Sequence, residues 1–180
     1  MGNEAAGRSF DVIVVGAGHA GVEASLACSR LGLDTLMITT NANRIAFMSC
    51  NPAIGGLAKG HMVREIDAMG GEMGLAADSS CIQFKRLNSK KGPAVRGSRA
   101  QCDKDKYSLY MTGRMRAQEN LTLVEGEAKS LLLSGSRCFG ILTESGEKIG
   151  AKSVIITTGT FMNGVMHTGL RTEAGGRVGD

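Results

Sequence analysis

The stretch that decides the fold reads FDVIVVGAGHAGVEASLACSRLGLDTLMITT and occupies residues 10–40 of the 180-residue chain. Its run Val12–Val15 has the length and β-branched content typical of a buried parallel strand. That run ends on Gly16-Ala17-Gly18-His19-Ala20-Gly21, a G-x-G-x-x-G match. An alanine-rich helical segment follows to about Arg30, and a second apolar run occupies residues 35–38. This order of strand, turn, helix and strand predicts an α/β domain with a parallel sheet.

In this context the glycine motif predicts a dinucleotide-binding site. Gly16 permits the sharp turn, Gly18 lets a pyrophosphate approach the backbone, and Gly21 allows the helix to pack closely on the strand. The helix N-terminus adds free amides and a partial positive charge for the phosphates. The alternative is a purely structural unit with an incidental glycine turn, which the position of the motif at the start of the domain disfavours.

The residues after the second strand depart from the standard dinucleotide pattern. An acidic residue for the ribose hydroxyl is expected about 20 residues beyond the glycines. This place holds Thr39-Thr40-Asn41 instead. Hydroxyl and amide side chains can still bond a ribose, but the missing acid argues against a standard NAD site here.

The charge of the chain is unevenly distributed along the sequence. The net charge is +4, yet residues 85–116 contain ten Lys or Arg and two acids, so this segment carries +8. Such a segment could face phosphate, nucleic acid or an acidic partner, and it could equally be a solvated surface. The 26 glycines show no period and the chain is 42% hydrophobic, which disfavours collagen-like and disordered classes.

The five cysteines indicate a reducing compartment. They form no C-x-x-C pair and no zinc-like spacing with the three histidines, so neither a disulfide framework nor a metal site is predicted. Residues 1–9 lack the apolar core of a signal peptide and are expected to be a flexible N-terminus. No apolar run approaches the roughly 20 residues that cross a bilayer. These observations predict a cytoplasmic protein without a membrane segment.

A second informative stretch, MSCNPAIGG at residues 48–56, contains Cys50. A helix is predicted over 57–69, and its apolar face, which includes Met62 and Met69, is expected to pack on the sheet. A cysteine near a helix N-terminus can have a lowered pKa and be reactive. Free cysteines are more often small buried apolar residues, and the residues alone favour that interpretation of Cys50.

The second half of the chain predicts one more helix and several strands. The helix is expected over 101–118, with its apolar positions at Tyr107, Tyr110, Met111 and Met115. A parallel strand over 121–124 and an antiparallel β-meander over 127–149 are expected to follow. A buried strand over 153–158 then runs into Thr-Gly-Thr, which brings the backbone close to another group. A doubly wound sheet normally continues beyond such a strand, so residues 10–180 are expected to be an incomplete fold.

Several segments together resemble one family. They are GAGHAGVEA at 16–24, MSCNPAIGGLAKGH at 48–61, SKKGPAVRGSRAQCD at 89–103, TTGTFMNG at 157–164 and GGRVGD at 175–180. In order and without large gaps, they are similar to the glucose-inhibited division protein A family (MnmG), the flavoprotein subunit of the tRNA uridine carboxymethylaminomethyl-modification enzyme. The CNPAIGG and KGPAVR segments are far more specific than the glycine motif, which generic flavin reductases share.

The resemblance implies a Rossmann-like FAD-binding domain of the glutathione-reductase type. It implies that the FAD pyrophosphate lies on residues 16–21, that Ala128 bounds the adenine, and that Thr158 and Gly159 belong to the site. It also implies an enzyme that adds a carboxymethylaminomethyl-type group to carbon five of the wobble uridine in tRNA, with a GTPase partner, a folate one-carbon donor and NADH. Cys50 matches the cysteine of the family's CNPA segment, which makes it the candidate nucleophile or acid/base group.

Members of this family are longer than this chain. The resemblance therefore implies the N-terminal part of an FAD domain, without the NADH-binding and C-terminal helical domains. We expect weak FAD retention and no modification activity from the isolated chain, and a homodimer for the full-length protein. Two alternatives remain open: another FAD/NAD(P)H oxidoreductase of a small molecule, and a non-catalytic nucleotide- or RNA-binding module that uses residues 85–116. Arg96 and Arg99 could contact the flavin, the tRNA or a second subunit, or brace their loop.

Overall fold

The computed structural model of the chain describes residues 7–159, 162 and 164–175. Residues 1–6 of the predicted flexible N-terminus and residues 176–180 of the GGRVGD segment lie outside this part. The α-helices in the described part are α1 (His19–Arg30), α2 (Lys59–Ala68), α3 (Met73–Ser80) and α4 (Lys104–Ala117), and a 3₁₀ turn, η1, spans Pro93–Val95. The strands there are β1 (Ser9–Val15), β2 (Thr35–Thr39), β3 (Ala53–Gly55), β4 (Cys81–Leu87), β5 (Gly97–Cys102), β6 (Leu121–Glu125), β7 (Ala128–Ser134), β8 (Arg137–Thr143), β9 (Lys148–Ile156), β10 (Val165–Thr168) and β11 (Arg171–Ala174).

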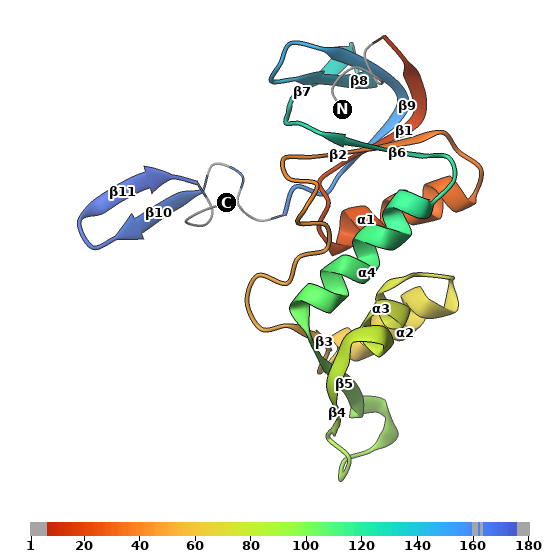
Figure 1. Cartoon of the computed structure of the whole chain (residues 1–180), viewed down its shortest axis with the longest axis vertical. Helices are drawn as coiled ribbons and strands as arrows, with labels where there is room; N and C mark the ends of the chain where they lie inside the picture. Colours follow the sequence, from red (N-terminus) through yellow and green to blue (C-terminus); the bar gives the residue numbers. More distant parts are fainter. Residues whose placement is uncertain (1–6, 160–161, 163, 176–180) are drawn as a thin grey trace.

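Six strands form the central sheet in the order β6-β2-β1-β9-β8-β7 (Figure 1). β6, β2, β1 and β9 are parallel, which confirms the strand–helix–strand prediction. β8 and β7 extend the sheet antiparallel from β9, so the expected meander is part of the central sheet, which is mixed. β9 is unbroken, and the last meander strand and the predicted strand over 153–158 are therefore one strand. The prediction that this strand is buried was wrong for its second half, where Ile156 is 54% exposed.

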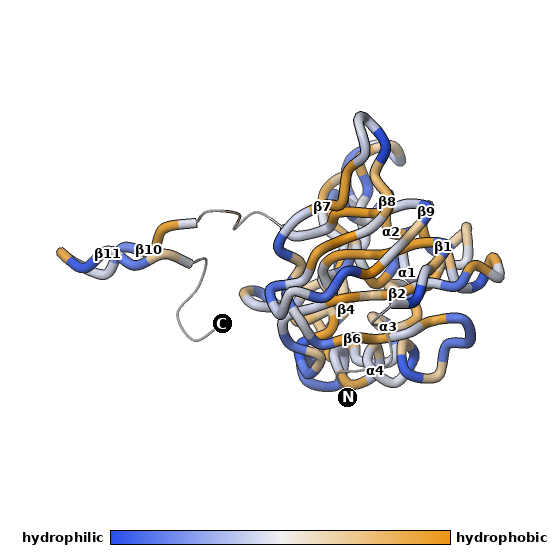
Figure 2. The backbone as a smooth tube through the Cα atoms, turned by 90° about the horizontal axis from the view of Figure 1, so that it is seen from above, coloured by the Kyte–Doolittle hydropathy of each residue, from blue (hydrophilic) through white to orange (hydrophobic). Residues whose placement is uncertain are grey.

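Apolar clusters cover both faces of the central sheet because side chains alternate between the faces of a strand. On one face, Val12, Val14 and Met37 pack with residues of α1 and α4. On the other face, residues of β1 and β2 pack with residues of β8 and β9; this second cluster comprises Phe10, Ile13, Leu36, Ile38, Ile141, Ile149 and Ala151. Figure 2 shows these hydrophobic strands gathered inside the body of the molecule. The central sheet is thus a rigid platform from which the loops of the site extend.

Helix α4 confirms the helix predicted over 101–118. Its cap is Asp103, whose carboxylate accepts hydrogen bonds from the amides of Asp105 and Lys106. The predicted apolar positions Tyr107, Met111 and Met115 are fully buried, and Tyr110 is half-buried. The apolar spacing in the sequence therefore located the buried face correctly.

A second, smaller sheet has the order β3-β5-β4 and is antiparallel. Helix α2 lies against β3, β5 and α3, and the prediction that it packs on the central sheet was wrong. Met62 and Met69 are 60% and 81% exposed, although the predicted apolar face includes them. Helix α3 fills part of the place where α2 was expected, because its Ala76 and Ala77 are buried in the main apolar cluster.

A buried carboxylate holds three helices together. Glu72, at the start of α3, is 1% exposed and binds Arg30 of α1 together with Tyr110 (2.8 Å) and Arg114 (3.0 Å) of α4. Burial alone would raise the pKa of Glu72, but the hydrogen bonds from Arg30 and Tyr110 and the two guanidinium charges lower it overall. Glu72 therefore stays ionised and acts as a charged joint between α1, α3 and α4.

The hairpin of β10 and β11 lies to the side of the main body (Figure 1). Its residues are mostly exposed in the part that the structure describes. None of the described helices is long and apolar enough to span a membrane.

Candidate functional site

The turn between β1 and α1 forms a backbone cradle. Gly16 has φ of 105°, a conformation that favours glycine, and its amide donates to the carbonyl of Ile38 (2.9 Å). The hydroxyl of Thr157, after β9, donates to the carbonyls of Val15 (2.8 Å) and Gly16 (3.2 Å). The turn is thereby attached to both neighbouring strands, which fixes its backbone before any ligand arrives.

Gly21 and Gly18 have different roles in this turn. A Cβ atom on Gly21 would overlap the carbonyl oxygen of Gly16, so glycine is needed for α1 to pack on the turn. A Cβ atom on Gly18 would meet nothing within 4 Å. Gly18 is also the N-cap of α1, where no side chain caps the helix. Gly18 also lines a cavity, so the start of α1 is open on this side, as a phosphate-binding helix requires.

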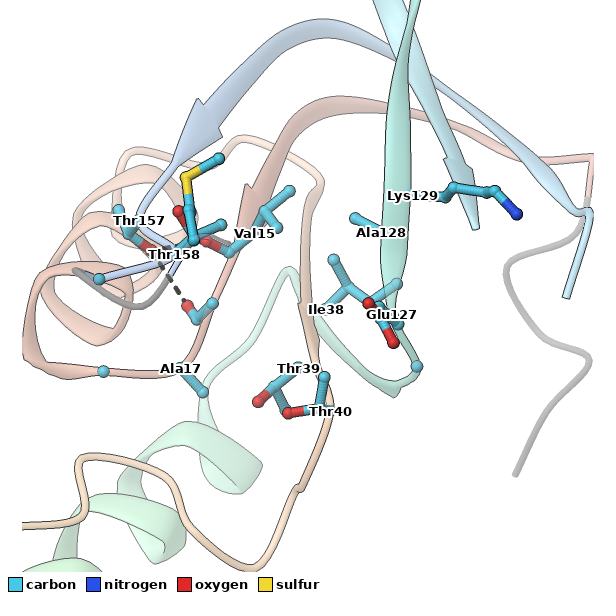
Figure 3. Close-up of a pocket in the computed structure, with 15 residues that line it drawn as sticks. Val15, Ala17, Ile38, Thr39, Thr40, Glu127, Ala128, Lys129, Thr157 and Thr158 are labelled. Atoms are coloured by element: carbon cyan, nitrogen blue, oxygen red, sulfur yellow. Dashed lines mark hydrogen bonds between the residues drawn. The ribbon is translucent and has the colours of Figure 1, made fainter. Parts of the chain in front are cut away.

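A cavity of about 640 Å³ opens in front of this turn, at the carboxyl ends of the parallel strands (Figure 3). Such a position is where open α/β sheets bind their ligands. Figure 3 shows Thr157 and Thr158 on one side of it and Glu127, Ala128 and Lys129 on the other. The cavity is lined by Val15, Gly16, Ala17, Gly18, Ile38, Thr39, Thr40, Gly126, Glu127, Ala128, Lys129, Thr157, Thr158, Gly159 and Met162.

Most of the residues predicted for cofactor binding meet at this cavity. Gly16, Ala17, Gly18, Ala128, Thr158 and Gly159 line it, whereas His19, Ala20 and Gly21 do not. The cavity wall also contains residues that the sequence did not predict for the site, among them Glu127, Lys129, Thr157 and Met162. The signal for Glu127 and Lys129 was available, because they flank Ala128 directly after a predicted parallel strand.

The ribose-binding acid is absent from the end of β2, as the sequence indicates. Thr39 and Thr40 occupy that edge of the cavity. Glu127 supplies a carboxylate to the cavity from the turn before β7. The carboxylate of Glu125 accepts a hydrogen bond from the backbone amide of Ala42 (2.9 Å) and so holds the loop after β2. Open helix amides, hydroxyls and one carboxylate are together the groups that a dinucleotide needs, so the lining fits such a ligand.

A second cavity, of about 540 Å³, lies on the other side of the same helix start. Polar residues from four segments meet in it: His19, Cys50, Lys59 and Arg99. Its remaining wall is largely apolar and comes from β3, α2 and α3. Gly18 lines the first cavity, and the next residue, His19, lines the second. The two cavities are therefore separated by the backbone at the start of α1.

Cys50 is exposed, and its interpretation as a small buried residue was wrong. It lies in a loop before β3, and the strand separates it from the start of α2. The buried cysteine is Cys102, whose thiol has a raised pKa because it is desolvated. Cys50 is thus the thiol that can meet a ligand in the second cavity.

His19 lines this second cavity, and one of its ring nitrogens has no partner among the described residues. Its Nε2 atom is buried and has no hydrogen-bond partner in the described part of the chain. Its ring lies 5.5 Å from the Tyr107 ring, tilted by 40°. Burial lowers the pKa of His19, so the imidazole is neutral at pH 7 and one of its ring nitrogens can accept a proton or a hydrogen bond.

Comparison with known proteins gives a consistent match. The family model of glucose inhibited division protein A matches residues 11–180. The tRNA uridine 5-carboxymethylaminomethyl modification enzyme MnmG of Bdellovibrio bacteriovorus is 63% identical over 97% of this chain and 27% of its own length. The protein of the same name from Geobacter sulfurreducens is 56% identical over 96% of this chain and 28% of its own length.

A solved structure agrees with this match. Aquifex aeolicus GidA, in its form I crystal, superposes with a TM-score of 0.92 at 50% identity, over 96% of this chain and 29% of that chain. This chain thus spans 27–29% of the length of these three relatives. The match over residues 11–180, with these identities over nearly the whole chain, shows that it belongs to the glucose-inhibited division protein A family.

Proposed function

We propose that the chain is the FAD-binding part of an enzyme that adds a carboxymethylaminomethyl-type group to carbon five of the wobble uridine in tRNA. The observation that carries this proposal is the pair of cavities on either side of the α1 start, one fitted to a dinucleotide and one holding an exposed thiol. The relatives named for this tRNA modification support the choice of reaction.

In this proposal the first cavity holds FAD, which supplies hydride transfer when bound. The open amides at Gly18 bind the pyrophosphate, and Gly16 and Ala17 form the backbone below it. The segment Glu127–Lys129 bounds the adenosine end, and Thr158–Gly159 closes the side next to β9. His19, Ala20 and Gly21 contribute through the shape of the helix start rather than through the cavity wall.

In the second cavity, Cys50 is the proposed catalytic residue. A thiol can add to the uracil ring and so activate carbon five, or it can act as an acid/base group. Arg99 and Lys59 line the same cavity and attract an anionic ligand there, while neutral His19 offers a proton acceptor. The free state of all five cysteines supports a reducing, cytoplasmic setting for such a thiol.

The partners that complete this function are also proposals. They are the tRNA, a GTPase partner subunit, a folate one-carbon donor, NADH and a second copy of the full-length protein. We assign the NADH site to none of the described residues. The first cavity fits a dinucleotide, but in this proposal FAD occupies it.

A chimera tests the proposal. In the chimera, residues 11–180 replace the matching part of the Bdellovibrio relative. The chimera is expressed in cells that lack their own enzyme, and the modified nucleosides of their tRNA are measured by mass spectrometry. We expect the chimera to restore the modified uridine, Cys50→Ser to abolish it, and Cys138→Ser, a half-buried thiol of β8, to retain it. A folded chimera without modified uridine would overturn the function, and a fully active Cys50→Ser chimera would overturn the role of the thiol.

A further inference from the structure

A basic hairpin projects from the small sheet. We call residues 85–99 the arm; it comprises the end of β4, the turn with η1, and the start of β5. The arm carries six cations and no acid, and the acid-free stretch extends over residues 79–102. Its cations are Lys85, Arg86, Lys90, Lys91, Arg96 and Arg99.

Four of the six cations of the arm are exposed and uncompensated. Lys85, Arg86, Lys90 and Lys91 are exposed, and no ion pair or side-chain hydrogen bond involves these four side chains within residues 7–159, 162 and 164–175. Other cations of the chain do form ion pairs: Arg30 and Arg114 with Glu72, and Lys129 with Glu144. Of the ten cations in residues 85–116, Arg114 is ion-paired with Glu72, and both acids of the segment, Asp103 and Asp105, lie outside the arm, so the arm keeps a charge of +6.

The turn of the arm is held by its own hydrogen bonds. The guanidinium of Arg96 donates to the carbonyl of Lys91 (3.0 Å), and the amide of the Asn88 side chain donates to the carbonyl of Val95 (3.1 Å). Lys90 and Lys91 are thus presented on a defined turn. A fixed array of cations loses less freedom on binding a polyanion than a flexible tail would.

The arm leads directly to the cavity of Cys50. Arg99 of β5 is paired with Lys85 of β4 on one side and with Gly55 of β3 on the other. Arg99 lines that cavity, and the side chain of Gln101 donates to Asn51 next to Cys50 (3.2 Å). At about 3.3 Å per residue, the paired strands extend about 7 Å from Arg99 to Gly97, and the turn with Lys90 lies beyond them.

We propose that the arm binds the phosphate backbone of a folded RNA and so brings one of its bases to the cavity of Cys50. This inference rests on the proposed function, which supplies an RNA substrate but does not say where it docks. A row of unpaired cations suits the regular charges of a phosphate backbone. Phe84, 64% exposed at the base of the arm, offers a ring on which an unpaired base can stack.

Binding of total tRNA to this chain, measured by fluorescence anisotropy from 50 to 300 mM NaCl, tests the proposal. We expect Lys90→Ala/Lys91→Ala to weaken binding about tenfold at the lowest salt and to reduce the slope of log affinity against log salt by about 1–2. Lys90→Arg/Lys91→Arg should keep the native affinity. The matched control is Arg137→Ala/Lys148→Ala, which removes two exposed cations from β8 and β9, far from the arm in Figure 1.

Equal losses in the arm and control variants would overturn the proposal, as would native affinity in the arm variant. Polyglutamate of equal charge is the competitor for an acidic protein partner. If it displaces tRNA as well as unlabelled tRNA does, the arm is not an RNA site. Melting temperatures of all variants should match the native chain, because these side chains are exposed and unpaired.

Alkylation of Cys50 reports whether the arm leads to the cavity. We expect an anticodon stem-loop RNA to slow the reaction of Cys50 with iodoacetamide, read by peptide mass spectrometry, and the arm variant to lose this protection. Unchanged alkylation in the presence of bound RNA would overturn the link between arm and cavity. The two proposals fail separately: tRNA that binds through the arm while the chimera makes no modified uridine contradicts only the proposed function.

Discussion

A methyl group added at Gly18 would enter open space, whereas the same group at Gly21 would collide with the carbonyl of Gly16. Packing of the helix on the turn thus requires glycine at position 21, whereas at position 18 glycine leaves free the space through which the proposed phosphate approaches. Gly18 has φ of −69° and ψ of −179°, a backbone that alanine also adopts. Gly21 is buried in α1, where the helix meets the turn.

We expect Gly18→Ala to cost less than about 1 kcal/mol of stability but to weaken FAD binding about tenfold, because the methyl group occupies the phosphate approach. Gly21→Ala should destabilise the chain by about 3 kcal/mol through overpacking. Thermal denaturation and titration with FAD, followed by quenching of its fluorescence, measure both effects. Equal melting temperatures for the two variants would contradict the separation.

His19 predicts a pH dependence of stability at the residue scale. The unfolded chain binds a proton at His19 near pH 6.5, and the folded chain binds it only at lower pH, because burial lowers the pKa. The unfolding free energy should therefore fall as the pH drops below about 6.5. His19→Asn should show a smaller fall between pH 7 and 5 in urea denaturation. A variant with the native pH dependence would show that another group causes it.

At the scale of elements, three helices depend on one carboxylate. We expect Glu72→Ala to cost about 3 kcal/mol, since it removes the acid that Arg30, Tyr110 and Arg114 share. Glu65→Ala, on the exposed side of α2, is the matched control and should stay within about 0.5 kcal/mol. Urea denaturation at pH 7 measures both variants. A small loss for Glu72→Ala would mean that apolar packing alone positions α3.

The unfolding free energy of the native chain should depend on pH in the acid range because of the interactions of Glu72. Because its neighbours lower the pKa of Glu72, its contribution is present above about pH 4.5 and is lost as the pH falls further. Glu72→Gln should remove this part of the pH dependence.

The sequence predicted those elements whose pattern is local. The glycine motif and the β-branched run located β1, α1 and β2, and the apolar spacing located α4 and its buried face. The prediction that the Met62 face of α2 packs on the central sheet was wrong. The spacing of the apolar residues indicates an apolar face, but it does not indicate which element, if any, covers that face. Helix α3 was missed because MGLAADSS is short and has no apolar period. Its position depends on Glu72, whose partners are distant in sequence.

The site was predictable to a similar extent. The cradle follows from a motif within six residues, but Thr157 reaches it only because β9 lies beside β1 in the sheet. The exposure of Cys50 depends on β3 joining the small sheet instead of continuing the loop. No local pattern around Cys50 indicates that pairing.

At the scale of the whole molecule, we expect the antiparallel strands β7 and β8 to unfold together with the turn between β1 and α1. We expect Ile141→Ala to cost about 2–5 kcal/mol, because Ile141 is fully buried against β1 and β2. Leu133→Ala, 58% exposed on β7, should cost less than about 1 kcal/mol. Circular dichroism melts should show a single transition for both. Two separate transitions would mean that β7 and β8 unfold as an independent hairpin.

The unbroken strand β9 has a consequence for hydrogen exchange. The amide of Gly150, near one end, donates to the carbonyl of Arg8, and the amide of Thr157, just past the other end, donates to that of Val15. Both bonds to the β1 segment break when the two strands separate. A nucleotide that binds only the folded cradle at 100 times its Kd adds about 2.7 kcal/mol to the free energy of that opening. Exchange should then slow about a hundredfold at Gly150 as well as at Thr157, although Gly150 lies at the opposite end of the strand from the cradle.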